Sequence, residues 1–314
     1  MKHPTVVVGA GLSGLIVARA LAARGEAVVV FEKSRGVGGR LATKRVGQAV
    51  FDQGAQFFTV RDPEFRALVD EWQSGGVVAP WPGNTHGRFI GRPSMTAVPK
   101  ALSAGLDIRR EHKVARLSRD QAGAWEIEVD GQGMVSADRV ILSAPVPQSL
   151  ALLAAGSIAL PEDVAAALQA VDYHPCLALL VVLDGPSQVP EEGVAFKEGA
   201  LRWMADNVRK GVSSGVPAAV TLHAAPEFAR ACYSLDEAEI AARLLPAAAP
   251  WLGEAKVVST TLHRWKFSEP RGTYPEACLW LPDLRLGFCG DGFGGPRVEG
   301  AAVSGFALAR RLAG

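Results

Sequence analysis

Three glycines near the start of the chain, Gly9, Gly11 and Gly14, have the spacing G-x-G-x-x-G. A run of β-branched residues at 6–8 precedes them and predicts a strand buried on both faces. An Ala- and Leu-rich segment at 12–23 follows and predicts a helix. In such a unit the first glycine allows a tight turn, the second lets backbone approach a pyrophosphate, and the third lets helix and strand pack closely. The spacing therefore predicts a dinucleotide-binding unit.

The predicted helix begins at Leu12 and Ser13, whose backbone N–H groups would face the phosphates. A second apolar strand at 27–31 ends on Glu32, where a carboxylate can accept hydrogen bonds from an adenosine ribose, and Lys33 follows it. One alternative is a structural β–turn–α unit without a ligand. The other is a secretory signal peptide, against which the three glycines and the second strand argue.

The composition excludes several classes of protein. With 48% hydrophobic and 21% charged residues, the 314-residue chain is typical of a globular protein of one large or two moderate domains. Its net charge of +1 gives no general attraction for nucleic acid or an anionic membrane, and no apolar run reaches membrane-spanning length. The four cysteines form no C-x-x-C pair and the six histidines show no ligand spacing. We therefore expect free thiols, no metal site and a cytoplasmic location.

A second glycine-rich loop, KSRGVGGR at 33–40, favours FAD over NAD as the cofactor. Gly36, Gly38 and Gly39 can lie flat against a ligand, and Arg40 can contact a phosphate. Flavin-binding two-dinucleotide-fold domains commonly carry the form E-x-x-x-x-x-G-G-R, which a nicotinamide Rossmann domain does not require. The loop therefore predicts non-covalently bound FAD. The alternative is a flexible loop with one surface arginine.

The segment AVFDQGAQFFT at 49–59 is predicted to meet the flavin ring. Gly54 and Ala55 are small enough for backbone to approach a flat ring, and Gln56 carries a donor and an acceptor for the ring edge or for a substrate amide. The alternative is a strand with a glycine bulge. Val114, in a later strand, is predicted to lie near the adenine.

The C-terminal segment repeats the strand–turn–helix pattern. An apolar strand at 284–289 is followed by Gly-Asp-Gly, which holds the Asp291 carboxylate where it can bind a ribityl hydroxyl. A helix of small residues at 298–312 begins at Val298, and its N-terminus can face the N1/C2 edge of the flavin. The alternative for Asp291 is a turn residue in an Asx motif.

The order of the elements predicts an α/β fold. We expect an FAD-binding two-dinucleotide (Rossmann-like) domain and a second, α+β substrate domain built on a mostly antiparallel sheet. The FAD domain is discontinuous, at 1–58, 95–150 and 284–314, and the substrate domain takes 59–94 and 151–283. The substrate domain's predicted helices lie at 160–171 and 235–245, and its strands at 176–183, 218–223 and 256–265.

Taken together, these motifs resemble the renalase-like group of FAD-dependent oxidoreductases, which is related to the flavin amine oxidases. The resemblance covers most of the chain. Its FAD motifs are shared by many flavoenzymes. FDQGAQFFT at 51–59, LRWMADNVRKG at 201–211 and HRWKF at 263–267 are much more specific.

Two loops depart from the family pattern. Where the family has W-x-A-R-N-S-S-K-P-G-R, this chain has Asp206 and lacks the Lys-Pro pair. Ala225 and Phe228 replace residues of the family's H-A-S-P-x-W-S. The contacts that loops 202–214 and 223–230 make with substrate are therefore left open, whereas the departures do not touch the cofactor motifs.

The resemblance implies an activity. Members of the group oxidise 2- or 6-dihydro isomers of NAD(P) by hydride transfer to flavin N5, and molecular oxygen then becomes hydrogen peroxide. Amine oxidation, or another FAD-linked dehydrogenation, is the alternative. A flavin-fold binding protein without catalysis and a plain NAD dehydrogenase are further readings. We expect a small-molecule substrate such as a reduced nicotinamide dinucleotide isomer, and favour a monomer.

Four residues are candidates for the substrate side. His223 ends an apolar strand, Trp265 lies in the H-R-W motif, Trp280 lies in the next strand, and Gln56 belongs to the ring-edge segment. Aromatic walls would hold a planar nicotinamide against the flavin. For each of them the alternative is a residue of the core. Arg61, Arg202 and Lys266 could bind a substrate diphosphate or be solvated surface charges.

Overall fold

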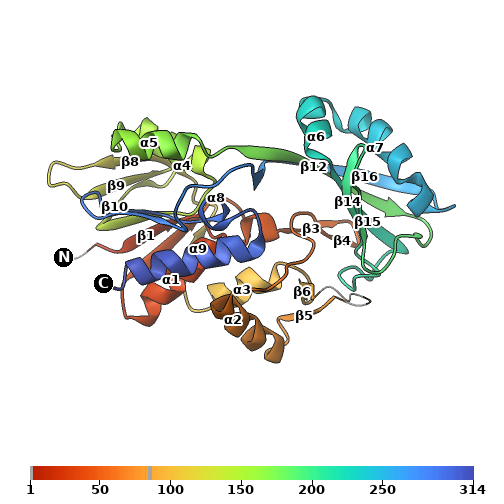
Figure 1. Ribbon diagram of the computed structural model, residues 1–314, viewed down its shortest axis with the longest axis horizontal. Coiled ribbons are helices and arrows are strands. Elements are labelled where there is room, and N and C mark those ends of the chain that lie inside the picture. Colours follow the sequence, from red (N-terminus) through yellow and green to blue (C-terminus); the bar gives the residue numbers. More distant parts are fainter. Residues whose placement is uncertain (1–2, 82, 84–86) are drawn as a thin grey trace.

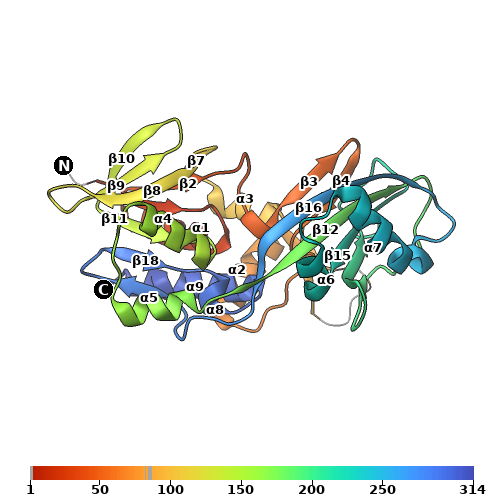
Figure 2. The ribbon, with the colours of Figure 1, turned by 90° about the horizontal axis from the view of Figure 1, so that it is seen from above.

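The computed structural model describes residues 3–81, 83 and 87–314, so the predicted segments 1–58 and 59–94 lie partly outside the described residues. The molecule is elongated, with one sheet in each half and both chain ends in the half of the first sheet (Figure 1). Two long strands, β12 and β16, run from the middle of the molecule into the second half (Figure 2).

The first sheet has six strands in the order β17–β18–β11–β1–β2–β7. All neighbours are parallel except β17, which is antiparallel to β18. The strands are β1 (Thr5–Val8), β2 (Val28–Glu32), β7 (Asp107–Arg110), β11 (Arg139–Leu142), β17 (Leu279–Leu281) and β18 (Leu286–Phe288). The strands predicted at 6–8 and 27–31 are therefore neighbours at the centre of a parallel sheet, which confirms the predicted Rossmann-like unit.

Both faces of this sheet are covered, as the apolar strands predicted. Val7 and Val30 pack in one hydrophobic cluster, whereas Val6 and Phe31 pack in another. The first face carries α1 (Leu12–Ala23), α2 (Pro63–Ser74), α3 (Ala97–Ser103) and α9 (Val298–Arg311). The second face carries the antiparallel strands β8 (Val114–Arg119), β9 (Trp125–Val129) and β10 (Gly133–Ala137) with α4 (Val146–Ala155) and α5 (Glu162–Gln169).

The second sheet has five antiparallel strands in the order β13–β14–β15–β12–β16. They are β12 (Tyr173–Leu183), β13 (Val194–Ala195), β14 (Leu201–Asp206), β15 (Ala218–Ala224) and β16 (Val257–Pro270). Helices α6 (Pro226–Cys232) and α7 (Glu237–Leu252) cover one face, where Leu177, Leu179 and Val181 of β12 are buried. The alternate residues of β12 therefore face the other way, toward the first half of the molecule.

Short hairpins fill the space between the two sheets. They are β3 (Thr43–Val46) with β4 (Ala49–Asp52), and β5 (Val78–Pro80) with β6 (Phe89–Gly91). Ala49 and Phe51 of β4 pack against Leu180 and Ala219 of the second sheet. A short helix, η1 (Gly39–Leu41), precedes β3, and another, α8 (Asp291–Gly294), precedes α9.

The first sheet takes more of the chain than the segments 1–58, 95–150 and 284–314. Strand β17 and helices α2 and α5, which lie in the ranges 59–94 and 151–283 assigned to the substrate domain, pack with it. Their sequence pattern does not distinguish the two sheets, because an apolar strand or an amphipathic helix suits either.

Helix α7 runs to Leu252, beyond the end at 245 that the sequence predicted, although Pro246 and Pro250 lie inside it. Ile240, Leu244 and Ala248 are fully buried at helical spacing against the second sheet. Burial of this face offsets the hydrogen bonds that the prolines remove, since packing supplies most of the stability of a helix in a protein.

A buried ion pair joins β4 to the second sheet. Lys210 Nζ lies 2.7 Å from Asp52 Oδ2, and both side chains are fully buried. Asp52 Oδ1 also accepts hydrogen bonds from Thr43 Oγ1 (2.8 Å) and from the backbone N–H of Met95 (3.0 Å). Burial lowers the pKa of Lys210, and the Asp52 carboxylate opposes that shift. The pair therefore ties the end of β4 to the loop after β14.

We expect Lys210→Met to lower the free energy of unfolding by about 3–5 kcal/mol, because it leaves the buried Asp52 carboxylate without its counter-ion. The double variant Asp52→Asn, Lys210→Met should recover much of the loss. Urea unfolding of the FAD-loaded protein measures both, with the exposed Lys256→Met as control. Equal stability of Lys210→Met and Lys256→Met would contradict the role given to the pair.

Candidate functional site

The first glycine loop has the geometry that its spacing predicted. Gly9 lies at φ +105°, a conformation that other residues rarely adopt. A Cβ at Gly14 would lie 2.5 Å from the backbone oxygen of Gly9, so only glycine lets helix α1 approach so closely. No atom of the residues that the structure describes lies within 4 Å of the Cβ position at Gly11. Helix α1 begins at Leu12, and Leu12 and Ser13 are buried beneath the loop.

Glu32 ends β2 with its carboxylate held beside this loop. It accepts hydrogen bonds from the backbone N–H groups of Ala10 (2.9 Å) and Ser34 (2.8 Å), and it is buried. Lys33 points to solvent. The carboxylate is therefore fixed at the end of the strand, next to the turn that would hold the pyrophosphate.

The second glycine loop folds back onto the first. The backbone N–H of Gly38 donates to the backbone oxygen of Ala10 at 2.8 Å. At Gly39, the atom of the described residues that lies nearest to the Cβ position is the Gly11 Cα, at 3.8 Å. The two loops thus face each other at Gly11 and Gly39, which carry no side chains, and together form a glycine cradle.

Arg40 and Asp291, predicted to bind phosphate and ribityl groups, are paired with each other. Arg40 Nη2 donates to Asp291 Oδ1 at 2.6 Å, and Nη1 also reaches the second carboxylate oxygen and the backbone oxygen of Ser268 (3.0 Å). The pair brings the second glycine loop to the segment that precedes α9, which begins at Val298. Residues 251 positions apart thus share one site.

The segment from Gln53 to Gln56 lies beside this pair, since the backbone N–H of Ala55 donates to the Arg40 oxygen at 2.9 Å. A Cβ at Gly54 would lie 2.0 Å from that same oxygen, so glycine is required there. The Gln56 amide nitrogen donates to the backbone oxygens of Asp52 and Gly54. Among the described residues, its Oε1 atom and that of Gln53 are buried without a donor. Two acceptors are therefore left for a ligand.

The second sheet contacts this segment through two predicted residues. His223 Nε2 and Trp265 Nε1 each lie 3.1 Å from the backbone oxygen of Gln53. Cross-strand pairing places Trp203, His223, Ala178 and His263 in one row across four strands. This row and Trp265, whose ring lies 4.2 Å from that of His263, form an aromatic face with a small residue at its centre.

The imidazoles of this face are uncharged at neutral pH. Burial lowers the pKa of His223 to about 4, although its hydrogen bond to Gln53 opposes the shift. Burial also lowers the pKa of His263, and the charge on Lys44 adds to this effect. The row therefore presents flat, neutral surfaces to the segment from Gln53 to Gln56.

Other predicted residues are not brought to this face. Trp280 lines an open cavity of about 610 Å³ with Thr5 and Arg139, at the amino ends of the parallel strands. Strand β17, which carries Trp280, pairs at the edge of the first sheet rather than the second, so this side chain lies away from His223 and Trp265. Val114 begins β8 and is buried in the same hydrophobic cluster as Phe31.

The three predicted diphosphate ligands, Arg61, Arg202 and Lys266, are all exposed. They lie in three separate segments of the chain. Glu299, at the start of α9, accepts a hydrogen bond from the backbone of Asp62 at 2.8 Å and also contacts the backbone N–H of Arg61. We had not singled out Glu299, which fixes the backbone at Arg61 rather than its side chain.

Five residues of the site were missed in the sequence. Asp52 was visible in the D-x-G-A-Q motif, but nothing local marks Lys210 as a buried lysine. Ala178, Trp203 and His263 join the face only through strand register, which the sequence does not specify. The available signals were the motifs at 201–211 and 263–267, which contain Trp203, Lys210 and His263.

The residues present fit FAD. The glycine cradle and Glu32 suit an adenosine diphosphate, and the unpaired Gln53 and Gln56 oxygens suit donors on a flat heterocycle. Among residues 3–81, 83 and 87–314 there is no cluster of three or more His, Cys, Asp or Glu that could hold a metal ion. Within the same residues, no helix combines the length and apolar character needed to cross a membrane.

Comparison with known proteins agrees with this fit. Residues 7–72 match the NAD(P)-binding Rossmann-like domain, and residues 73–313 match the family described as flavin containing amine oxidoreductase. Because the second match covers most of the chain, this protein belongs to the flavin-containing amine oxidoreductase family, whose cofactor is FAD.

Similarity to individual proteins is local in sequence and global in fold. The chain is 44% identical over 71 residues to putrescine oxidase of Kocuria rosea and 43% identical over 65 residues to protoporphyrinogen oxidase 2 of Arabidopsis thaliana. These matches cover 23% and 21% of this chain but only 15% and 13% of the two relatives. Wild-type putrescine oxidase in complex with putrescine has the same fold, with a TM-score of 0.74 at 15% identity over 100% of this chain and 99% of that one.

We expect Glu32→Ala to purify with less FAD than the wild type, because the variant loses the carboxylate placed to bind ribose. The flavin-to-protein absorbance ratio measures the content. Glu227→Ala, an exposed carboxylate on α6, is the matched control. Equal flavin content in the two variants would contradict the assignment of Glu32.

His223 should make stability depend on pH. Its pKa is about 4 in the folded protein against 6.5 ordinarily, so the unfolded chain binds a proton between these values that the folded protein does not. Stability present above pH 6.5 is then lost as the pH falls toward 4, by at most about 1.4 kcal/mol per pH unit. Urea unfolding at several pH values should show a shallower slope for His223→Gln than for the exposed control His3→Gln. Equal slopes would contradict the buried, neutral state of His223.

Proposed function

We propose that this protein is an FAD-dependent oxidase of the renalase type, which removes a hydride from a 2- or 6-dihydro isomer of NAD(P). The observation that carries the proposal is the neutral aromatic face opposite the segment from Gln53 to Gln56. His223, His263 and Trp265 line it without a fixed charge. A dihydronicotinamide ring is flat and uncharged, so such a face suits it better than it suits an ammonium group.

The chain's own residues have positioning tasks in this reaction. Trp265 and Trp203 supply flat walls against which a planar ring can be held, and Ala178 between them leaves room for it. Gln56 presents its Oε1 acceptor because both N–H groups of its amide point to backbone oxygens. Hydride transfer requires close approach, orientation and exclusion of water rather than a general base, so an unprotonated His223 is no obstacle.

When bound, FAD would accept the hydride at N5 and pass the two electrons to molecular oxygen, which becomes hydrogen peroxide. Glu32, the two glycine loops and Asp291 would hold the cofactor. The N-terminus of α9 would lie toward the flavin edge where negative charge develops. All four cysteines are free, which fits the reducing cytoplasm that we propose as the location.

Amine oxidation is the second candidate. It is favoured by the family and by the relatives named putrescine oxidase and flavin-containing monoamine oxidase. One carboxylate, that of Glu269, lines a cavity beside His223 and could attract an ammonium group. Against it, Arg202 lines the same cavity and would repel a cation.

We expect 6-dihydro-NAD, added without oxygen, to bleach the flavin absorbance within milliseconds to seconds, and oxygen to restore it with formation of hydrogen peroxide. Putrescine in the same assay should leave the flavin oxidised. Trp265→Ala should slow bleaching about tenfold to a hundredfold, because the dihydronicotinamide ring is then held less firmly. Trp251→Ala, on α7, should leave the rate of bleaching unchanged. Bleaching by putrescine alone would overturn the proposal in favour of amine oxidation.

A further inference from the structure

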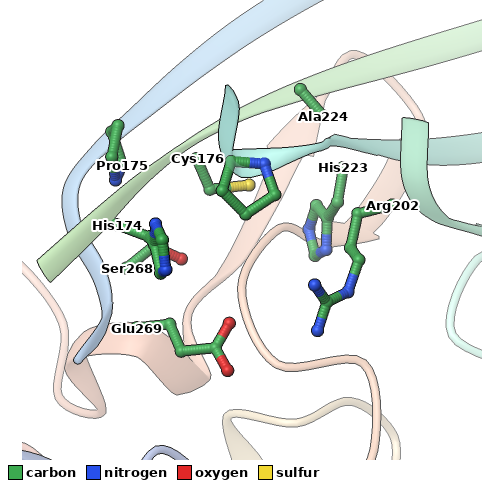
Figure 3. Close-up of a pocket in the computed structure, with 9 residues that line it drawn as sticks. His174, Pro175, Cys176, Arg202, His223, Ala224, Ser268 and Glu269 are labelled. Atoms are coloured by element: carbon green, nitrogen blue, oxygen red, sulfur yellow. The ribbon is translucent and has the colours of Figure 1, made fainter. Parts of the chain in front are cut away.

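A cavity of about 100 Å³ lies at the end of the second sheet that is nearer to the first sheet. Six of its lining residues have polar or ionisable side chains: His174, Cys176, Arg202, His223, Ser268 and Glu269. They come from β12, β14, β15 and β16, and Figure 3 shows their side chains gathered around one space. The cavity is therefore built by four strands rather than by one loop.

Two opposite charges face each other across this cavity. The Glu269 carboxylate and the Arg202 guanidinium point toward one another in Figure 3. In the part of the chain that the structure describes, neither forms an ion pair within 4.0 Å, with the other or with any third group. Both groups thus keep hydrogen-bonding capacity for a molecule between them.

One further charge lies beside the cavity, because Arg230 contacts the lining residue His174 without lining the cavity itself. Arg230 Nη2 lies 3.1 Å from His174 Nδ1, which acts as the acceptor because a guanidinium can only donate. Burial raises the pKa of the Cys176 thiol to about 12, so this thiol is neutral at pH 7. The arginine and acidic side chains that line the cavity itself are therefore one guanidinium and one carboxylate, Arg202 and Glu269.

The cavity borders the aromatic face. His223 lines the cavity and also contacts the backbone oxygen of Gln53. Cys176 pairs across the strands with Trp265. The backbone oxygen of Ser268, another lining residue, accepts a hydrogen bond from Arg40. A flat ring held by Trp265 could therefore extend a substituent into this cavity.

We infer that this cavity is a subsite for a primary carboxamide, with Arg202 donating to the amide oxygen and Glu269 accepting from the amide nitrogen. The inference rests on the proposed function, since a carboxamide is the substituent of a nicotinamide ring. An ammonium group would satisfy Glu269 but be repelled by Arg202, and a carboxylate would satisfy Arg202 but be repelled by Glu269. The cavity thus selects a neutral group that is both donor and acceptor.

Three pyridines that differ only in charge test this subsite: nicotinamide, nicotinate and 3-(aminomethyl)pyridine. Calorimetry with the oxidised, FAD-loaded protein at neutral pH measures their binding without turnover. We expect nicotinamide to bind the wild type about tenfold more tightly than either ion. Glu269→Gln should improve nicotinate binding, and Arg202→Gln should improve aminomethylpyridine binding. Each substitution should weaken nicotinamide about tenfold.

The matched controls are Arg271→Gln and Glu276→Gln, which change two exposed side chains. Both should leave the affinities for the three pyridines unchanged. The subsite is overturned if nicotinamide affinity is the same in Arg202→Gln, Glu269→Gln and the controls, or if aminomethylpyridine binds the wild type most tightly. The assay with 6-dihydro-NAD separates the two proposals. If 6-dihydro-NAD bleaches the flavin but the affinities of the three pyridines do not depend on charge as expected, the proposed function stands and the subsite is wrong. If the affinities show that dependence but the flavin is not bleached, the subsite stands and the proposed function is wrong.

Discussion

The buried pair of Asp52 and Lys210 is the interaction on which the site depends. Asp52 ends β4, and its backbone N–H and oxygen bond to Asn207 Oδ1 (3.0 Å) and Thr221 Oγ1 (3.1 Å). Three residues of the second half of the molecule, Lys210, Asn207 and Thr221, therefore hold Asp52 directly before the segment that runs to Gln56. A buried pair of this kind contributes little net stability but is costly to break, so it specifies position.

The two sheets divide the chemistry between them. The first sheet is parallel, is buried on both faces, and presents its carboxyl ends to the glycine loops, where backbone groups suit a dinucleotide. The second sheet is antiparallel and turns one face to α7 and the other to β4, so its inner face is free to carry aromatic and imidazole groups. The segment from Gln53 to Gln56 lies where these two surfaces meet.

Much of the cofactor site could be read from the chain. Gly9, Gly14 and Glu32 lie where their spacing placed them, because a tight turn, a close helix and a strand end are local features of about 30 residues. The substrate side could be read only in part. His223 and Trp265 converge on one backbone oxygen, whereas Trp280 lies at the far end of the first sheet. All three looked alike in sequence, as polar or aromatic residues of apolar strands.

The sequence by itself determined a Rossmann-like unit, a second glycine loop of the flavin-binding form, and a later, mostly antiparallel sheet. These features depend on residues that are close together in the chain. They are the backbone conformations that only glycine tolerates and the hydrophobic periodicities of two and 3.6 residues. Only the tertiary structure decided that Arg40 meets Asp291, that Lys210 is buried under Asp52, and that Arg202 faces Glu269 across a cavity. These pairs join residues between 67 and 251 positions apart, and strand register and sheet order, which no local pattern specifies, bring them together.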